Sequence, residues 1–360
     1  MIIGMLHSEE DPRCPLTKVT LKKYAQIGME VLAENKVLEL HQEDLTEINE
    51  FRLASRVEIL QKADIVYSNL PLNAEDLSHL NEMAILISFY APYRSEQSLK
   101  GIEHLSNHVF SLDMIPRSTI AQSMDSLSSM ASISGYKAVI IAAERLPRYF
   151  PMMMTAAGTI KPASVLVLGA GVAGLQAIAT ARRLGAKVFA FDVRTAVKEE
   201  VKSLGAKFVE VEGAREDDSA GGYAVEQTED FQRRQKEAIA RSVKESDVVI
   251  TTAQIRGRTA PVLITKEMVE QMSPGSVIVD LAASTGGNCE LTKDNEELEH
   301  QGVLIIGDSH LYKKASIDAS TLLANNIYHF IAMLITDKGL DIDLENEIIS
   351  ASLVHPKNQS

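Results

Sequence analysis

A glycine-rich turn between a short apolar run and a helical pattern constrains the fold of this chain more than any other feature. The run at residues 165–168 is bounded by Pro162 and Gly169, a pattern typical of a strand buried in a parallel sheet. The glycines that follow have the spacing G-x-G-x-x-G and are Gly169, Gly171 and Gly174. Apolar residues at helical spacing come next, and a second apolar run ends at Asp192. The stretch predicts a strand–turn–helix–strand unit of an α/β sheet.

Each part of this unit has a physical role in binding a dinucleotide. Gly169 permits a tight turn, Gly171 lets a pyrophosphate approach the backbone, and Gly174 lets the helix pack close to the sheet. Val172 and Ala173 lie at the expected N-terminus of the helix, where free N–H groups and the helix dipole favour phosphate. The alternative is a glycine-rich turn in an α/β protein that binds nothing.

The acidic residue after the second apolar run bears on which dinucleotide binds. Asp192 can accept hydrogen bonds from an adenosine ribose and would repel a 2′-phosphate. The sequence therefore favours NAD(H) over NADP(H). Val193 and Arg194 follow directly, and the cationic Arg194 weakens that preference a little.

Composition and charge exclude several classes of protein. The chain has 360 residues, enough for two domains that each have a core. Its formal net charge of −13 argues against a nucleic-acid or anionic-membrane surface. Cys14 and Cys289 match no metal-ligand spacing and indicate a reducing, cytosolic setting, so no metal is expected. The uncharged run at residues 163–181 is divided by glycines, so no direct membrane insertion is expected.

The remaining pattern alternates between strands and helices on both sides of the glycine turn. It predicts an α/β protein with two Rossmann-like, doubly wound parallel-sheet domains, joined by long crossover helices. The expected domains are residues 1–130 plus 320–360, which form an N-terminal α/β domain, and residues 131–319, which form the dinucleotide-binding domain. The pattern also predicts helix-like segments over residues 45–61, a connecting segment over 152–161 and a polar tail over 340–360.

Two loops that follow expected strands could face a bound dinucleotide. In the first, Thr252 and Ala253 could place small groups against a ribose, although an ordinary strand-end turn explains them as well. In the second, Gly286 and Gly287 permit close backbone approach, and Asn288 could bond an amide. We favour the binding interpretation for the second loop.

A third polar segment lies at the expected boundary between the domains. Arg117, Gln122, Asp125 and Ser128 form a dense polar set there. The last three share a face if the segment is helical, because they are spaced three residues apart. Composition alone favours a helix cap followed by a solvated face.

Several of these segments resemble the proton-translocating nicotinamide nucleotide transhydrogenases, which share a family with alanine dehydrogenases. Residues 116–129, Pro-Arg-x-x-x-Ala-Gln-Ser-Met-Asp-x-Leu-Ser-Ser, are similar to the Arg-Gln-Asp loop of that family. Further similar stretches are residues 169–181, 192–194, 221–224, 264–269, 275–283 and 286–290. The resemblance covers most of residues 115–350, and the chain resembles the family's separate, peripheral NAD(H)-binding component.

The resemblance implies hydride transfer between NAD(H) on this chain and NADP(H) on a partner subunit, coupled to proton translocation by a separate membrane component. It also implies a homodimer in the cytoplasm, associated with the inner membrane through partner subunits. By resemblance, Arg117, Gln122, Asp125 and Ser128 would hold the nicotinamide and its ribose, and a loop carrying Tyr223 would close over the nucleotide. Direct hydride transfer needs two nicotinamide rings in contact and dry, without a side-chain acid or base.

Two alternatives remain. Alanine dehydrogenases are similar in using a Lys and a His to hold and protonate a keto acid, but the corresponding stretches here are residues 67–69, Tyr-Ser-Asn, and 89–90, Phe-Tyr. Without those two groups, keto-acid chemistry loses its general acid. Residues 13–17 resemble that family's Arg-Val-Ala-Leu-Thr, whereas the first hundred residues otherwise diverge. The second alternative is a non-catalytic NAD(H) sensor, which would bind tightly without transferring hydride.

Overall fold

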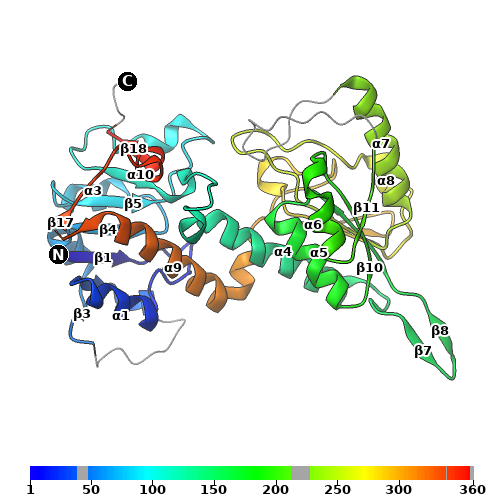
Figure 1. Ribbon diagram of the computed structural model, residues 1–360, viewed down its shortest axis with the longest axis horizontal. Helices are drawn as coiled ribbons and strands as arrows, with labels where there is room; N and C mark the ends of the chain where they lie inside the picture. The colour runs from blue at the N-terminus through cyan, green and yellow to red at the C-terminus, as the bar shows by residue number, and fades with distance from the viewer. Residues whose placement is uncertain (39–47, 212–227, 338, 357–360) are drawn as a thin grey trace. The chain divides into compact units, whose positions relative to one another are not determined.

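A computed structural model describes residues 1–38, 48–211, 228–337 and 339–356 of the chain. Its contacts divide the chain into two compact units, one of Met1–Met130 with Ala315–Ser360 and one of Ala131–Lys314. Each unit is built on a seven-stranded sheet (Figure 1). The expected α/β architecture with two parallel-dominated sheets is confirmed.

The sheet of the first unit has the strand order β18-β6-β5-β4-β1-β2-β3. All its neighbouring strands are parallel except β18, which runs antiparallel to β6. The strands are β1 (Ile2–Leu6), β2 (Glu30–Ala33), β3 (Phe51–Leu53), β4 (Ile65–Ser68), β5 (Ile85–Ser88), β6 (Val109–Ser111) and β18 (Leu353–His355). The helices are α1 (Lys18–Gln26), α2 (Arg56–Lys62), α3 (Ala74–His79) and α10 (Glu347–Ser352).

The sheet of the second unit repeats this plan in the order β11-β10-β9-β12-β13-β15-β14, with β14 as its antiparallel edge. The strands are β9 (Ser164–Leu168), β10 (Lys187–Phe191), β11 (Lys207–Phe208), β12 (Val248–Thr251), β13 (Val277–Asp280), β14 (Glu296–His300) and β15 (Val303–Gly307). The helices are α5 (Val172–Arg183), α6 (Lys198–Ser203), α7 (Glu229–Lys244) and α8 (Lys266–Val269). The central strands β12 and β13 are buried along their whole length, because a parallel sheet is covered on both faces.

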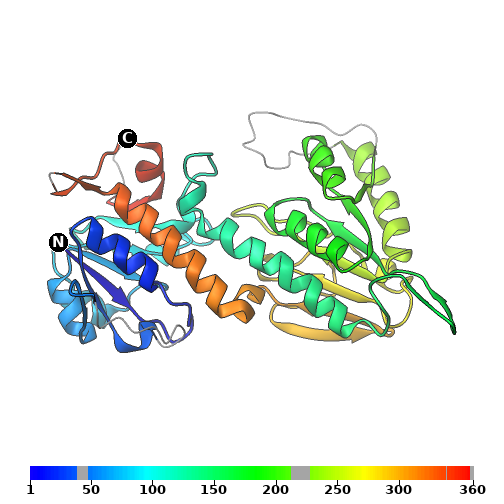
Figure 2. The ribbon, with the colours of Figure 1, turned by 60° about the horizontal axis from the view of Figure 1, so that its bottom comes forward.

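Two long helices lie near the boundaries of the units. Helix α4 (Ser126–Arg145) continues across the first boundary, and α9 (Ser316–Met333) begins just after the second. Within the second unit α4 runs beside α5 (Figure 2), where a Cβ atom on Gly135 would lie 2.1 Å from the carbonyl oxygen of Ala173. Within the first unit α9 packs on α1, with the rings of Tyr24 and Tyr328 centred 5.1 Å apart. Glycine at position 135 thus allows α4 to touch the first turn of α5.

The structure differs in four places from the local structure expected from the sequence. Residues 51–53 form β3 where a helix is expected, and residues 153–160 form a hairpin of β7 (Met153–Thr155) and β8 (Gly158–Ile160). The expected polar tail contains α10 and β18, and the charged β14 is missed altogether. These strands are short, and β3, β7, β8 and β14 are largely exposed, so their sequences lack the apolar runs that mark buried strands.

Burial also sets the chemistry of a thiol in the core of the second unit. Cys289 is fully buried, and this burial raises the pKa of its thiol from 9.0 to about 11. We expect Cys289 to resist thiol reagents at pH 8 in the folded protein, because only about one such thiol in a thousand is then ionised. Mass spectrometry of the labelled peptides checks this, with a urea-unfolded sample as the positive control.

The same pKa shift gives an expected pH dependence of stability. The folded pKa is raised, so the stabilisation is fully present below pH 9.0, the unfolded value, and is lost as the pH rises towards about 11. Urea titrations of the wild type and Cys289→Ala from pH 8 to 11 measure the difference. A pH dependence identical in the two proteins would contradict this assignment.

Candidate functional site

Two glycines of the turn between β9 and α5 are explained by the fold itself. Gly169 has a φ of +97°, in the left-handed region that favours glycine, and a Cβ there would lie 2.6 Å from Thr252 Oγ1. A Cβ on Gly174 would lie 1.9 Å from the carbonyl oxygen of Gly169, so any side chain would push α5 away from β9. Close helix–strand packing therefore requires both glycines.

Gly171 is different, because neither packing nor conformation requires a glycine there. Its φ is −80°, which any residue adopts, and no described atom lies within 4 Å of a Cβ built on it. Gly171 is also the N-cap of α5, and it has no side chain to satisfy the first-turn N–H groups, which include those of Val172 and Ala173. This opening suits an anion such as a pyrophosphate, which the N–H groups and the helix dipole would hold.

Asp192 directly follows β10, and its carboxylate is bonded to the glycine turn. Oδ2 accepts from the backbone N of Ala170 at 2.7 Å and from Arg194 Nη2 at 2.8 Å. Oδ1 accepts from the backbone N and the Nε of Arg194, each at 2.9 Å. The bond to Asp192 raises the pKa of Arg194 despite the opposing effect of burial. Val193, between them, is half-buried and packs against the apolar cluster on one face of the sheet.

The loops after β12 and β13 are tied together by one amide. Asn288 is fully buried; its Oδ1 accepts from Ala253 N at 2.9 Å, and its Nδ2 donates to the carbonyls of Ala253 and Pro261 at 2.8 and 2.9 Å. Both N–H groups of the amide thus donate to protein carbonyls. The bond from Asn288 to a ligand amide stays a prediction. Thr252 Oγ1 donates to the carbonyl of Gly169 at 3.0 Å, which joins the first loop to the glycine turn.

A buried carboxylate that no sequence pattern singled out organises the loop after β13. Asp280 Oδ2 accepts from Asn288 N at 2.7 Å, Cys289 N at 3.0 Å and Thr292 Oγ1 at 2.8 Å. Gly286 and Gly287 have φ values of +104° and +82°, and the backbone conformation accounts for both glycines. The signal that could have found Asp280 was an acid that ends a buried apolar strand just before this glycine pair.

The polar segment of the first unit forms a helix cap. Asp125 lies just before α4, where Oδ1 accepts from Ser128 N at 2.9 Å and Oδ2 from Ser128 Oγ at 2.5 Å, as at a helix N-cap. Gln122 lies on a separate 3-10 turn, η4 (Gln122–Met124), so the three residues do not share one continuous helix. Asn326 of α9 holds this turn by donating to the carbonyl of Ser123 at 2.8 Å.

The structure thus places the predicted residues in two groups. Those of the glycine turn, Asp192–Arg194 and the loops after β12 and β13 are bonded to one another in the second unit. Arg117, Gln122 and Asp125 belong to the first unit, and the side chains of Arg117 and Gln122 are exposed. Tyr223 lies outside the described residues, so its predicted role stays a prediction.

Comparison with known proteins places this geometry in a family. Residues 7–134 match the family described as "Alanine dehydrogenase/PNT, N-terminal domain", and residues 138–359 match the corresponding C-terminal domain. A Rhodospirillum rubrum protein, named as the first part of NAD(P) transhydrogenase subunit alpha, is 40% identical over 356 residues, which cover 96% of this chain and 93% of that protein. The NAD(P) transhydrogenase subunit alpha of Haemophilus influenzae is also 40% identical, over 97% of this chain and 69% of that protein.

Solved structures agree with the sequence comparison. The transhydrogenase from Sinorhizobium meliloti superposes with a TM-score of 0.86 at 37% identity, covering 98% of both chains. An L-alanine dehydrogenase superposes with a TM-score of 0.76 at 20% identity, over 99% of this chain and 97% of that one, and shows a shared fold. The family resemblance in the sequence is confirmed: the chain belongs to the alanine dehydrogenase/PNT family.

Proposed function

We propose that this chain is the NAD(H)-binding subunit of a NAD(P) transhydrogenase and takes part in direct hydride transfer between NAD(H) and NADP(H) held by a partner subunit. The opening at Gly171 carries the proposal, because it is the one glycine of the turn that folding does not explain. The relatives named as transhydrogenase alpha subunits support the reaction. A separate membrane component would couple the transfer to proton translocation.

The residues of the second unit would bind the adenosine diphosphate half of NAD(H). The N–H groups of Val172 and Ala173 would hold the pyrophosphate, and Asp192 would accept hydrogen bonds from the ribose hydroxyls. Arg117 and Gln122 would position the nicotinamide end, and the bond between Asp125 and Ser128 would keep their loop in shape. The bound dinucleotide supplies the hydride or accepts it, so these residues would bind, orient and exclude water.

Attachment to the membrane would be indirect. Among the described residues no helix is both long and apolar enough to cross a bilayer. We propose that the chain lies in the cytoplasm and reaches the inner membrane through its partner subunits. The Rhodospirillum rubrum and Haemophilus influenzae relatives are both named after a transhydrogenase subunit, which supports an assembly with other chains.

A keto-acid dehydrogenase is disfavoured by the residues near the strand ends of the first unit. The guanidinium of Arg13 forms a buried ion pair with Asp11, to which its Nε donates at 2.8 Å. Asn69, near where alanine dehydrogenases would carry a Lys, donates instead to the carbonyls of Asp11 and Arg13 at 3.2 and 2.7 Å. An arginine already compensated by Asp11, beside an asparagine in place of the lysine, is poorly suited to hold and protonate a keto acid.

The reaction can be tested by mixing the purified chain with an NADP(H)-binding transhydrogenase component. We expect NADPH to reduce an NAD analogue in the mixture and not with either protein alone, followed by absorbance. Gln122→Asn should slow this transfer while leaving the Kd of NADH nearly unchanged, because it shortens a positioning side chain. As a control, the partner component must support transfer with another transhydrogenase alpha subunit. If this chain then binds NADH without transferring hydride, the result would favour the non-catalytic NAD(H) sensor.

Two glycine variants separate binding from folding. Gly171→Ala should leave the free energy of unfolding within about 0.5 kcal/mol of the wild type, yet weaken NADH binding at least about tenfold, because the methyl group would fill the pyrophosphate opening. Gly174→Ala should destabilise the fold by about 2 kcal/mol or more through its contact with the Gly169 carbonyl. Urea unfolding and calorimetric titration with NADH measure the two effects. Unchanged NADH binding by Gly171→Ala would rule out this pyrophosphate site.

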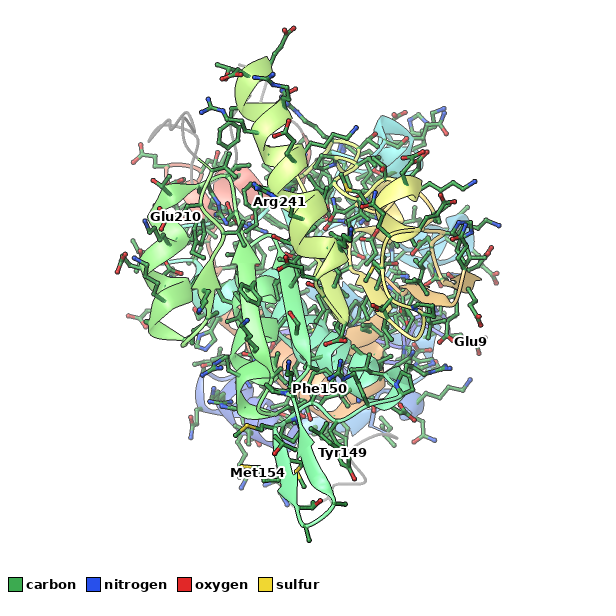
Figure 3. The ribbon with its side chains drawn as sticks, turned by 90° about the vertical axis from the view of Figure 1, so that its right-hand side faces the viewer. Glu9, Tyr149, Phe150, Met154, Glu210 and Arg241 are labelled. Atoms are coloured by element: carbon green, nitrogen blue, oxygen red, sulfur yellow. The ribbon has the colours of Figure 1, made fainter. Side chains whose placement is uncertain are left out.

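We also propose a homodimer, supported by the hairpin of β7 and β8. The hairpin extends away from the body of the second unit, with Met154 on it and Tyr149 just before it (Figure 3). All six of its strand residues are exposed, and the side chain of Met154 is 74% exposed. An isolated two-stranded hairpin is at best marginally stable in water, so a second copy of the chain would stabilise it by covering its methionines.

Replacing one hairpin methionine tests the dimer. Met154→Asp should weaken dimerisation at least about tenfold, because a carboxylate would be buried in an apolar contact. Light scattering coupled to size exclusion gives the mass over a concentration series. Met83→Asp is the matched control, since Met83 is 85% exposed and belongs to the first unit, whereas the hairpin belongs to the second. A monomeric wild type, or equal effects of both variants, would contradict the proposal.

A further inference from the structure

The carboxylate expected to bind the adenosine ribose is already saturated with protein donors. A carboxylate offers about four acceptor positions, and four N–H groups from Ala170 and Arg194 bond the two oxygens of Asp192 at 2.7–2.9 Å. The Asp192 side chain is only 7% exposed, whereas the Arg194 side chain is 28% exposed. Two ribose hydroxyls therefore have no acceptor position at Asp192 in this arrangement.

Two kinds of donor bond the Asp192 carboxylate, backbone N–H groups and the Arg194 guanidinium, and only the guanidinium can move away from it. The backbone N–H groups of Ala170 and Arg194 are fixed by the turns that contain them, and Asp192 itself lies at the end of a buried strand. The guanidinium of Arg194 is at the end of a flexible, partly exposed side chain. It contributes the Nε and Nη2 donors, which are the same in number as the two hydroxyls of a ribose.

We propose that the Arg194 side chain is a displaceable latch, which occupies the ribose position on Asp192 and must swing away when the dinucleotide binds. This inference rests on the proposed binding of NAD(H). Binding exchanges two N–H···O bonds from the guanidinium for two O–H···O bonds from the ribose. The free energy needed to open the ion pair therefore offsets part of the binding free energy. Arg194 therefore lowers the affinity for NAD(H), which helps a subunit that must release its dinucleotide in each turnover.

The latch also bears on the choice between the two dinucleotides. A 2′-phosphate is repelled by Asp192 but attracted by a guanidinium displaced to the rim of the same site. Removing the cation should therefore strengthen NADH binding and weaken NADPH binding at once. A purely structural role for Arg194 would weaken both, and a direct contact from Arg194 to the bound ribose would weaken NADH binding.

Calorimetric titration of NADH and NADPH into Arg194→Gln tests the latch. We expect NADH binding to tighten by about two- to fivefold, the effect of removing one partly exposed ion pair, and NADPH binding to weaken. Arg183→Gln is the matched control: it removes the same charge from an exposed position on the last turn of α5 and should change neither Kd. An NADH analogue lacking both hydroxyls of the adenosine ribose should bind the wild type and Arg194→Gln equally.

A measurement on the wild-type chain keeps the test independent of how the variant folds. The Nε–H proton of Arg194, assigned by NMR, should show the shift of a bonded group in the free protein and lose it when NADH is added. Unchanged or weaker NADH binding by folded Arg194→Gln, or an Nε–H resonance that NADH leaves in place, would overturn the latch. Failure of the wild type to bind NADH at all would instead overturn the proposed function.

Discussion

The second unit depends on a contact that only a hydrogen atom can fill, between the α-carbon of Gly174 and the carbonyl oxygen of Gly169. This contact seats α5 against β9, so the N-terminus of the helix opens beside the carboxyl ends of the central strands. The carboxylate of Asp192 and the hydroxyl of Thr252 then reach the same turn from two other strand ends. The geometry proposed for the dinucleotide is thus a consequence of close packing between one helix and one strand.

Two buried side chains, those of Asp280 and Asn288, hold the loops after β12 and β13 in place. The carboxylate of Asp280 accepts from three backbone N–H groups and from Thr292 Oγ1, and the amide of Asn288 bonds to the backbone of Ala253 and Pro261. In the first unit, Asp125 and Ser128 satisfy each other while the side chain of Gln122 is exposed. The motif at residues 116–129 therefore contains both residues that hold the loop, Asp125 and Ser128, and a residue with an exposed side chain, Gln122.

The sequence was most informative where a pattern is continuous and buried. The apolar run, glycine spacing and acid around residues 165–192 identify β9, α5 and β10, because each depends on local chemistry. The hairpin of β7 and β8 and the edge strand β14 were not found, since their pairing is set by tertiary structure rather than by apolar periodicity. Asp192 was predicted as an acceptor, but its occupation by Arg194 depends on side-chain geometry that spacing does not encode.

The edges of the second sheet have a consequence for behaviour in a crowded solution. Among the described residues, one edge strand of the sheet is β11, which is only two residues long, and the other is β14, whose sequence is Glu-Glu-Leu-Glu-His. A short edge strand offers few unpaired backbone groups to a strand of another molecule. The carboxylates of β14 repel the same acidic edge of a second copy. Both edge strands therefore disfavour the addition of strands from other molecules, which is the first step of edge-to-edge aggregation into fibrils.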